Sequence, residues 1–341
     1  MIAIVGQGRM AQVHARVWSS LGLGEKIRYV CTLRPGAPLE HAAAARFVTD
    51  LDVVLSDHEV EIVSVCTPTP THADISIRAL NAGKNVLLEK PIALTLQQAI
   101  AIRDAAAASR GILMVAQVVR FFAGYRVLRE AVEAGSIGTA LSARAVRITS
   151  ATDTAPWLRD ESQSGGVLVD FAVHDFDQLN LFLGTPGAVT AVRATEAGPV
   201  ETTVDYREGG IGQVQSFMSM PAGTPFTSSL ELLGTRGVAG YQFSGGPAGV
   251  PGVPAGSGIG ATGHEGKGIS AYRLVTAAET SLTTVGGDDP YARQAEYFLH
   301  CVESGESPTL CPVDAAIAAL SVSLAARESL ATSTRIVIPS C

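Results

Sequence analysis

The chain contains little charge, and its small excess is acidic. Of its 341 residues, 17% are charged, and 25 Lys and Arg against 32 Asp and Glu give a formal net charge of −7. Nucleic acids and anionic membranes attract basic surfaces, so this balance argues against either as a general partner. Hydrophobic residues make up 47% of the chain, which is enough for a large core and too many for extended disorder.

Long apolar runs, paired cysteines and a metal-ligand pattern are missing as well. No run approaches the ~18 uncharged apolar residues that a membrane helix needs. The five cysteines form no C-x-x-C pair, and Cys31 and Cys66 lie in apolar strand-like runs, so we expect buried free thiols. The chain opens on a strand and a turn rather than on the basic region and cleavage site of a signal peptide. We therefore expect a metal-free protein of the reducing cytoplasm.

The first third of the chain alternates between short apolar runs and helical periodicity. Runs that are apolar on nearly every residue are typical of parallel strands covered on both faces. The expected strands are residues 2–5, 27–32, 61–66, 85–89 and 112–116, and the expected helices are residues 10–21, 71–82 and 95–108. This order predicts an α/β fold, with a doubly wound parallel sheet in a Rossmann domain over residues 1–118.

After residue 118 the pattern changes to strands with partial alternation, expected at residues 140–150, 188–195, 201–206, 211–219 and 228–233. One long helix, around 167–183, interrupts them, which predicts an α+β domain with an open, mainly antiparallel sheet over residues 119–341. Helical periodicity returns at 290–304 and 313–330, and these helices could pack back on the first domain. The Gly/Pro-rich stretch 244–268 fits a surface loop, with a lid or an oligomer contact as the alternative.

A glycine-rich turn follows the first expected strand. The strand Ile2–Val5 runs into Gly6-Gln7-Gly8-Arg9-Met10-Ala11, a G-x-G-x-x-A pattern at the start of a helix. Gly6 and Gly8 would let the backbone approach a pyrophosphate, and the helix N-terminus offers free N–H groups and a partial positive charge. Arg9 could cover the phosphates. The alternative is a plain strand–helix turn without a ligand.

The second strand lacks the acidic residue that usually holds the adenosine ribose hydroxyls. Thr32 stands in the expected place, and Arg34 follows two residues later. No carboxylate would repel a 2′-phosphate there, and Arg34 could pair with one or lie over the adenine. The sequence therefore leaves NAD and NADP open as cofactors.

Two further strand ends carry polar residues. The third strand ends in Cys66-Thr67-Pro68, where Thr67 and Pro68 could line the nicotinamide ribose, and His72 follows as a ligand contact or a structural residue. Glu89-Lys90-Pro91 ends the next apolar run, and a lysine buried there without partners would cost several kcal/mol. A lysine in this place therefore indicates a function beside the cofactor. Pro91 could follow a cis peptide bond.

A second polar cluster falls on the helix after Ser164-Gly165-Gly166. Asp170, His174 and Asp177 are spaced i, i+4 and i+7, so a regular helix would place them on one face. A solvated helix face is the plain alternative. The histidine favours proton transfer, because its pKa lies near neutral pH.

With these motifs in place, the chain resembles the glucose–fructose oxidoreductase / inositol dehydrogenase / rhizopine-catabolism (Gfo/Idh/MocA) family over nearly its whole length. The resemblance is carried by the glycine-rich turn, Thr67-Pro68 with His72, Glu89-Lys90-Pro91, Arg120-Phe121 and Asp170-x-x-x-His174-Asp175. It implies a Rossmann domain followed by a domain with an open, mainly antiparallel sheet that often forms dimers or tetramers. The missing acid at Thr32 and Ala123 in place of a frequent proline depart from the family pattern.

The resemblance also implies roles for individual residues. Lys90, Asp170 and His174 would form the catalytic set, acting on a pyranose sugar, an aminosugar, a glycoside or a cyclitol. The expected cofactor-binding residues are Gly6, Gly8, Arg9, Met10, Thr32, Arg34, Thr67, Pro68, His72, Glu89 and Lys90. Candidate substrate contacts are Arg120, Trp157, Arg159 and Tyr291.

The chemistry of alcohol oxidation agrees with this set. His174 would take the hydroxyl proton as general base, Lys90 would stabilise developing alkoxide charge, and Asp170 would orient the hydroxyl or His174. The same residues would serve reduction of a keto-sugar. A nicotinamide-assisted glycoside hydrolase and a cofactor-binding regulator are the alternatives, since fold does not fix function.

Overall fold

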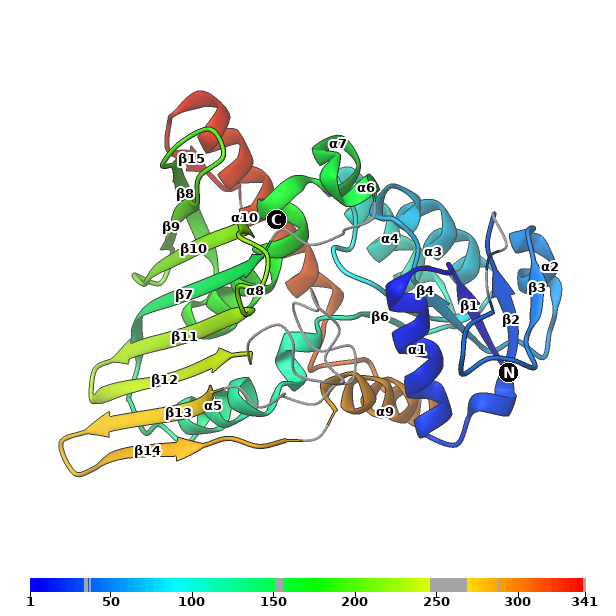
Figure 1. Cartoon of the computed structure of the whole chain (residues 1–341), viewed down its shortest axis with the longest axis horizontal. Coiled ribbons are helices and arrows are strands. Elements are labelled where there is room, and N and C mark those ends of the chain that lie inside the picture. The colour runs from blue at the N-terminus through cyan, green and yellow to red at the C-terminus, as the bar shows by residue number, and fades with distance from the viewer. Residues whose placement is uncertain (34–35, 37, 151–155, 246–268, 288, 340–341) are drawn as a thin grey trace. The chain divides into compact units, whose positions relative to one another are not determined.

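The computed structural model describes residues 1–33, 36, 38–150, 156–245, 269–287 and 289–339 (Figure 1). The chain divides into two compact units. The first comprises Met1–Val118 and Tyr291–Ile317, and the second comprises Val119–Pro290 and Ala318–Cys341. The chain first passes from the first unit to the second after Val118. The segment Tyr291–Ile317 returns to the first unit, as its helical periodicity allowed.

In the described part of the first unit, six parallel strands form one sheet in the order β3-β2-β1-β4-β5-β6. This is the order of dinucleotide-binding sheets, whose halves diverge from the neighbours β1 and β4. The predicted parallel sheet is therefore confirmed. The strands are β1 (Ile2–Val5), β2 (Ile27–Cys31), β3 (Arg46–Val48), β4 (Ile62–Val65), β5 (Asn85–Leu88) and β6 (Leu113–Val115).

Apart from α2, the helices of the first unit begin and end close to the predicted limits. Thr95 caps the last helix between strands by accepting a hydrogen bond from the Gln98 N–H at 3.2 Å. Helix α9 lies beside α1, as residues of both line one cavity (Figure 1). The helices are α1 (Arg9–Ser20), α2 (Leu51–Ser56), α3 (His72–Asn81), α4 (Leu96–Ala108) and α9 (Pro290–Ser304).

In the described part of the second unit, nine strands form a sheet in the order β14-β13-β12-β11-β7-β10-β9-β8-β15. All neighbours are antiparallel except β7 and β10, which run parallel. The prediction of a mainly antiparallel sheet is confirmed. The strands are β7 (Ala140–Ser150), β8 (Pro186–Arg193), β9 (Val200–Tyr206), β10 (Ile211–Met220), β11 (Thr227–Gly234), β12 (Gly237–Ser244), β13 (Ile269–Thr276), β14 (Thr280–Thr284) and β15 (Ile336–Val337).

Helices cover one face of this sheet. Helix α5 (Ala123–Glu133), helix α8 (Val173–Leu183) and the later part of α10 (Val313–Thr332) contribute Leu128, Phe176 and Val322 to one buried core. The sheet adds alternate residues such as Val214 and Leu232, which matches the period of two in the sequence. The Gly/Pro-rich stretch begins inside β12, and its residues 246–268 lie outside the described residues.

Among the described residues, α10 alone is long and apolar enough to cross a membrane by length and composition. It carries Asp314, Arg327 and Glu328, and 56% of its apolar window is buried inside the structure. Its buried side chains belong to the core, and a core helix passes the same test of length and composition.

The cysteines match the prediction as far as they are described. Cys31, Cys66, Cys301 and Cys311 are all buried, and none of them forms a disulfide bond. Burial raises the pKa of the Cys66 thiol well above its ordinary value, which keeps it protonated and unreactive. Cys341 lies outside the described residues.

Candidate cofactor and active site

Three of the predicted site segments follow neighbouring parallel strands. Gly6 comes directly after β1, Thr67 after β4, and Lys90 after β5, and these strands lie side by side in the order β1-β4-β5. The carboxyl ends of parallel strands meet at one edge of a sheet, where ligands of such folds bind. The first unit therefore gathers the glycine-rich turn, Thr67 and Lys90 at a single edge.

The first glycine of the turn is required by the backbone. Gly6 has φ = 118°, a conformation that side chains rarely allow, and its N–H donates to the Cys31 carbonyl at 2.8 Å. A Cβ at Gly6 would lie 2.6 Å from the carbonyl oxygen of Cys66. Gly6 thus lets the turn pass between the ends of β2 and β4.

The second glycine leaves room for a ligand. Gly8 precedes α1, and a Cβ built on it meets no described atom within 4 Å. No side chain caps α1, and its first turn contains no acidic residue. The N–H groups and the positive end of the helix dipole therefore fit a pyrophosphate in this turn. Arg9 is exposed and Met10 half-buried at the same helix end.

At the end of β2, Thr32 is half-buried, and its N–H donates to the Val48 carbonyl at 2.9 Å. The next residue, Leu33, is 86% exposed. Arg34 lies outside the described residues, so its predicted contact with a 2′-phosphate or an adenine stays a prediction.

His72 joins two of the strand ends. Its ring is buried, with Nδ1 2.8 Å from the Pro91 carbonyl and Nε2 3.0 Å from the Thr67 carbonyl. A neutral imidazole carries one N–H and can donate to only one of these carbonyls at a time. The predicted cis bond is present at Lys90–Pro91. The geometry favours the structural interpretation of His72, which the sequence left open beside a ligand contact.

The buried position of His72 predicts acid sensitivity. Burial lowers the pKa of His72 below its ordinary 6.5, although its two carbonyl neighbours raise it in part. The folded chain therefore binds fewer protons than the unfolded chain as the pH falls through 6.5. The stability contributed by neutral His72 is present above that pH and is lost as the pH falls towards the folded pKa. We expect His72→Gln to lose less unfolding free energy than wild type between about pH 7.5 and 5.5.

Urea titrations at both pH values measure this difference. Replacement of the exposed His58 by glutamine is the matched control and should keep the wild-type pH dependence. An equal loss in His72→Gln and in wild type would contradict the prediction.

In Glu89-Lys90-Pro91 the buried charge is the glutamate. Glu89 is buried, and its Oε1 lies 3.0 Å from Nε2 of the buried His14 on α1. The other carboxylate oxygen accepts the backbone N–H of Lys90 at 3.2 Å. Lys90 itself is half-buried. The expected buried lysine is thus corrected: the side chain of Glu89 faces inward with a partner, and Lys90 stands at the edge.

The helix that carries Asp170 and His174 is not regular. Residues Val167–Phe171 form a π-helical turn, and α8 begins at Val173. Such turns widen the helix by one residue and often occur at functional sites. Asp170 and His174 are both half-buried, whereas Asp177 is buried. Asp177 thus differs from the other two residues in its burial, and the shared face stays a prediction.

Asp177 forms a buried ion pair with Arg120. The Nε and Nη2 atoms of Arg120 donate to the two carboxylate oxygens at 2.7 and 2.6 Å. This two-point pairing favours a structural role for Arg120, and its predicted substrate contact stays a prediction.

Another buried ion pair, which was not predicted from the sequence, packs against the π-helical turn. Arg147 on β7 donates from Nε and Nη2 to Asp175, both at 2.8 Å. Its guanidinium also lies over the rings of Phe171 and Phe226, 5.8 and 5.7 Å from their centres. Burial works against the charge on Arg147, yet the neighbouring Asp175 carboxylate raises its pKa. The sequence offered one signal for this pair: Arg147 falls at an inward-facing position in the alternating pattern of β7.

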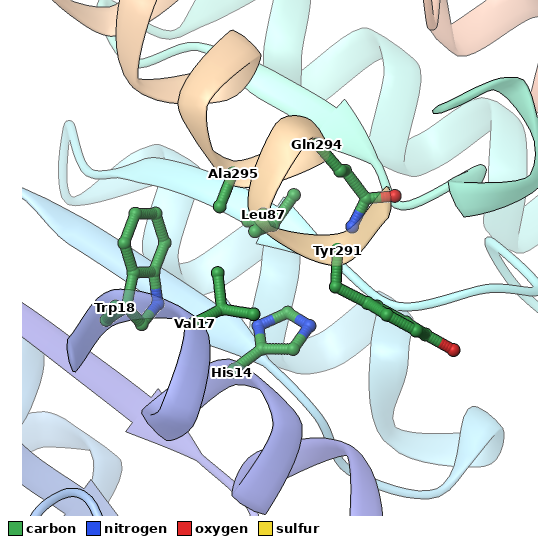
Figure 2. A pocket seen from close by; sticks show the side chains of 7 residues that line it. All are labelled: His14, Val17, Trp18, Leu87, Tyr291, Gln294 and Ala295. Atoms are coloured by element: carbon green, nitrogen blue, oxygen red, sulfur yellow. The ribbon is translucent and has the colours of Figure 1, made fainter. Parts of the chain in front are cut away.

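The remaining substrate candidates lie in different surroundings. Trp157 is half-buried and Arg159 exposed in the short helix α6 (Pro156–Arg159) of the second unit. Tyr291 is buried in the first unit, where it lines a cavity with His14 (Figure 2).

The predicted catalytic residues are divided between the units: Lys90 belongs to the first unit, and Asp170 and His174 belong to the second. Within the described residues, no three His, Cys, Asp or Glu side chains gather as a metal site.

Comparisons with known proteins match both halves of the chain. Residues 1–117 match a family model described as "Oxidoreductase family, NAD-binding Rossmann fold", and residues 125–239 match one described as "GFO/IDH/MocA C-terminal domain". The first description agrees with the nucleotide-binding features of the glycine-rich turn.

Individual relatives cover most of the chain. Scyllo-inositol 2-dehydrogenase (NAD(+)) of Bacillus subtilis (strain 168) is 25% identical, over 96% of this chain and 93% of that protein. Myo-inositol 2-dehydrogenase of Thermotoga maritima is 28% identical, over 69% and 73%. The solved structure of levoglucosan dehydrogenase in complex with NADH has a TM-score of 0.81 and 19% identity, covering 100% of this chain and 99% of that chain. This last likeness shows the shared fold.

Proposed function

Because the chain belongs to the Gfo/Idh/MocA family of oxidoreductases, we propose that it transfers hydride between NAD(P) and a secondary ring hydroxyl or ketone of a sugar or cyclitol. The main support for this proposal is that the Gly6–Gly8 turn, Thr67 and Lys90 all follow neighbouring strands at one edge of the parallel sheet. Inositol dehydrogenases among the relatives support the substrate class. Ring hydroxyls of aminosugars and glycosides belong to the same chemical class.

In this proposal the glycine-rich turn and α1 hold the pyrophosphate. When bound, the nicotinamide dinucleotide supplies the hydride acceptor or donor. His174 takes the hydroxyl proton during oxidation and returns it during reduction. Lys90 donates a hydrogen bond to the reacting oxygen and stabilises its developing negative charge. Asp170 orients the hydroxyl and balances the lysine charge.

A substrate screen tests the proposal. Cyclitols, free sugars, aminosugars and glycosides are incubated with NAD or NADP, and the absorbance of the reduced nicotinamide is followed. Net reduction with a cyclitol or a sugar supports the dehydrogenase. Glycoside cleavage without net cofactor turnover would point to a nicotinamide-assisted hydrolase. Tight cofactor binding without any turnover would point to a regulator and overturn the proposal.

Because position 32 carries a threonine and not an acid, an acidic substitution there should shift the cofactor preference towards NAD. A carboxylate introduced by Thr32→Asp would repel the 2′-phosphate of NADP and could bind the ribose hydroxyls of NAD. We expect the ratio of kcat/KM for NAD over NADP to rise by about tenfold or more, the effect of 1.4 kcal/mol in differential binding.

Steady-state kinetics with both cofactors measure this shift in preference. Thr32→Ser keeps the side chain neutral and serves as the matched control, which should leave the ratio close to the wild-type value. An unchanged ratio in Thr32→Asp would show that the ribose does not lie at the end of β2. Arg34→Ala separates a contact of that arginine with a 2′-phosphate from one with adenine, because only the former lowers kcat/KM for NADP selectively.

We also propose that the protein acts in the cytoplasm as a dimer or tetramer. Ile211 on β10 and Leu233 on β11 are 50% and 48% exposed, and they flank Ser142 of the strand β7 that lies between them. Their exposure on the sheet supports association through this surface. Sedimentation analysis of wild type and of Ile211→Glu tests it, and a wild-type monomer would contradict it.

A further inference from the structure

Four buried charged side chains lie around the first two turns of α8. Arg120, Arg147, Asp175 and Asp177 are 6%, 1%, 1% and 3% exposed. Removing such charges from water costs several kcal/mol each, and a buried ion pair often stabilises a protein no more than apolar side chains of the same size. The same helix also contributes Phe176 to the apolar core. The stability of the fold alone therefore gives little reason for two ion pairs on this helix.

The two aspartates lie on either side of His174 around the helix axis. Successive residues of an α-helix are turned by about 100° around its axis. All three residues belong to α8, so Asp175 stands about 100° from His174 in one direction, and Asp177 about 60° from it in the other. Rotation of the helix about its axis would carry His174 and both aspartates together. Contacts that fix the two aspartates therefore also fix the direction in which His174 leaves the helix.

Arginines from two different elements hold these aspartates. Arg147 comes from β7 and donates from Nε and Nη2 to Asp175, both at 2.8 Å. Arg120 comes from the short helical turn Val118–Phe121 and donates from the same two atoms to Asp177 at 2.7 and 2.6 Å. Each two-point contact aligns a carboxylate with the plane of its guanidinium. Rotation of α8 in either direction would therefore misalign four short hydrogen bonds at once.

The guanidinium of Arg147 also reaches the π-helical turn. It lies 5.8 Å from the centre of the Phe171 ring, and Phe171 directly follows Asp170 in the chain. Asp175 in the same way directly follows His174. One buried guanidinium thus contacts the residue next to each of the two predicted catalytic side chains, and it joins the two helical segments that carry them.

We propose that the two buried pairs position the ring of His174 by fixing the rotation of α8. The pair Arg147–Asp175 also holds the π-helical turn against this helix, and the pair Arg120–Asp177 anchors the other flank. All four side chains are positioning residues, because they act through the helix and not on the substrate. Their effect on turnover rests on the proposed function of His174, whereas the fixed place of its ring does not.

An apolar replacement of the first pair separates position from stability. In Arg147→Met with Asp175→Leu, apolar side chains fill the space without an unpaired charge, so the protein should fold, but they no longer fix the rotation of α8. We expect kcat to fall by about 10- to 100-fold, as when a reacting group is slightly misplaced, while the Kd for the reduced cofactor stays near wild type. Steady-state assays and urea titrations of the full-length protein measure turnover and folding.

An exposed ion pair of the same unit provides the matched control. The side chains of Arg335 and Asp205 are 55% and 47% exposed, and neither residue belongs to α8. The variant Arg335→Met with Asp205→Leu should keep the wild-type kcat. A wild-type kcat in folded Arg147→Met with Asp175→Leu would overturn the proposal, because the helix would then keep its place without the pair.

A lysine variant tests the proposal even if the apolar variant does not fold. Arg147→Lys retains the positive charge opposite Asp175, but a lysine ammonium is a point charge and cannot make the planar two-point contact. We expect kcat to fall by about tenfold or more in this variant as well. A wild-type kcat would show that charge alone is sufficient, and it would overturn the role of the two-point contact.

The place of the His174 ring can be measured without turnover. In ¹H–¹³C correlation spectra of histidine-labelled protein, comparison with His174→Ala identifies the signals of this ring. We expect one sharp set of signals in wild type, and broadened or additional signals in Arg147→Met with Asp175→Leu, because the ring would then occupy several positions. A single set of equally sharp signals in both proteins would overturn the proposal.

The second pair has its own test. Arg120→Met with Asp177→Leu should also lower kcat and leave the KM for the substrate near wild type. A selective rise in that KM would assign Arg120 to substrate binding and overturn its place as an anchor.

Failure of the proposed function has a different signature from failure of this inference. If the proposed function is wrong, His174→Ala retains wild-type turnover on every substrate, while the ring signals still broaden in Arg147→Met with Asp175→Leu. If the inference is wrong, His174→Ala loses turnover, while that double variant keeps both the wild-type kcat and the sharp ring signals.

Discussion

Replacing His174 by alanine is expected to lower kcat by about 10²- to 10⁴-fold, which is the usual contribution of a general base. The hydroxyl proton must leave the substrate oxygen as hydride leaves the carbon, and alanine offers no atom to receive it. His174 lies at the first turn of α8, beside a π-helical turn that carries Asp170. The half-buried ring is accessible enough to exchange a proton and sheltered enough to hold its place.

The cofactor should still bind in His174→Ala, because the glycine-rich turn belongs to the first unit. Quenching of protein fluorescence by the reduced cofactor gives the Kd, and steady-state assays with the best substrate of the screen give kcat. The exposed His300 on α9 provides a matched control, and His300→Ala should keep wild-type values for both. Near-normal turnover in His174→Ala would remove this residue from the catalytic set.

Elements of the first unit could be predicted from the sequence because each parallel strand is a short apolar run with a clear boundary. Gly6 and Gly83 mark such boundaries, and both have positive φ. The strand Arg46–Val48 was missed because it spans three residues, begins with an exposed arginine and lies at the sheet edge. Helix Leu51–Ser56 was missed for its length of six residues. In the second unit, Gly237 and Gly240 hid the strand β12.

The candidate site was predictable where the signal is local. The turn Gly6–Gly8 and the segment Glu89-Lys90-Pro91 are contiguous motifs. The partners of these motifs are not local: Glu89 meets His14 across 75 positions, and Asp177 meets Arg120 across 57. Pairs at such distances leave no periodic trace in one sequence. A single sequence therefore does not show that Glu89 is the buried charge of its segment, or that Asp177 pairs with Arg120.

The π-helical turn had no sequence signal either. A regular α-helix has 3.6 residues per turn, and residues 167–171 depart from this spacing. Phe171, in this turn, packs against Phe226 and the guanidinium of Arg147. Contacts of this kind join residues far apart in the chain and cannot be read from local spacing.

These contacts predict that Asp175→Ala destabilises the second unit by about 3–5 kcal/mol. The mutation removes the carboxylate but leaves the guanidinium of Arg147 buried, at 1% exposure, without its charge partner. A charge that is buried alone costs far more than the pair contributes. The loss should appear in the urea dependence of hydrogen exchange along β7, which carries Arg147.

An exposed ion pair and a double variant serve as controls for this prediction. Arg335 and Asp205 lie 2.7 Å apart but are 55% and 47% exposed, so Asp205→Ala should cost no more than about 1 kcal/mol. Replacing both buried partners, in Arg147→Met with Asp175→Leu, removes the unpaired charge and should recover much of the stability that Asp175→Ala loses. If Asp175→Ala cost no more than Asp205→Ala, the buried pair could not be what holds the π-helical turn. The double variant could also recover stability and yet lose turnover. In that case the ion pair serves the placement of Asp170 and His174 rather than the stability of the fold, because apolar side chains can fill the space but cannot replace the paired hydrogen bonds.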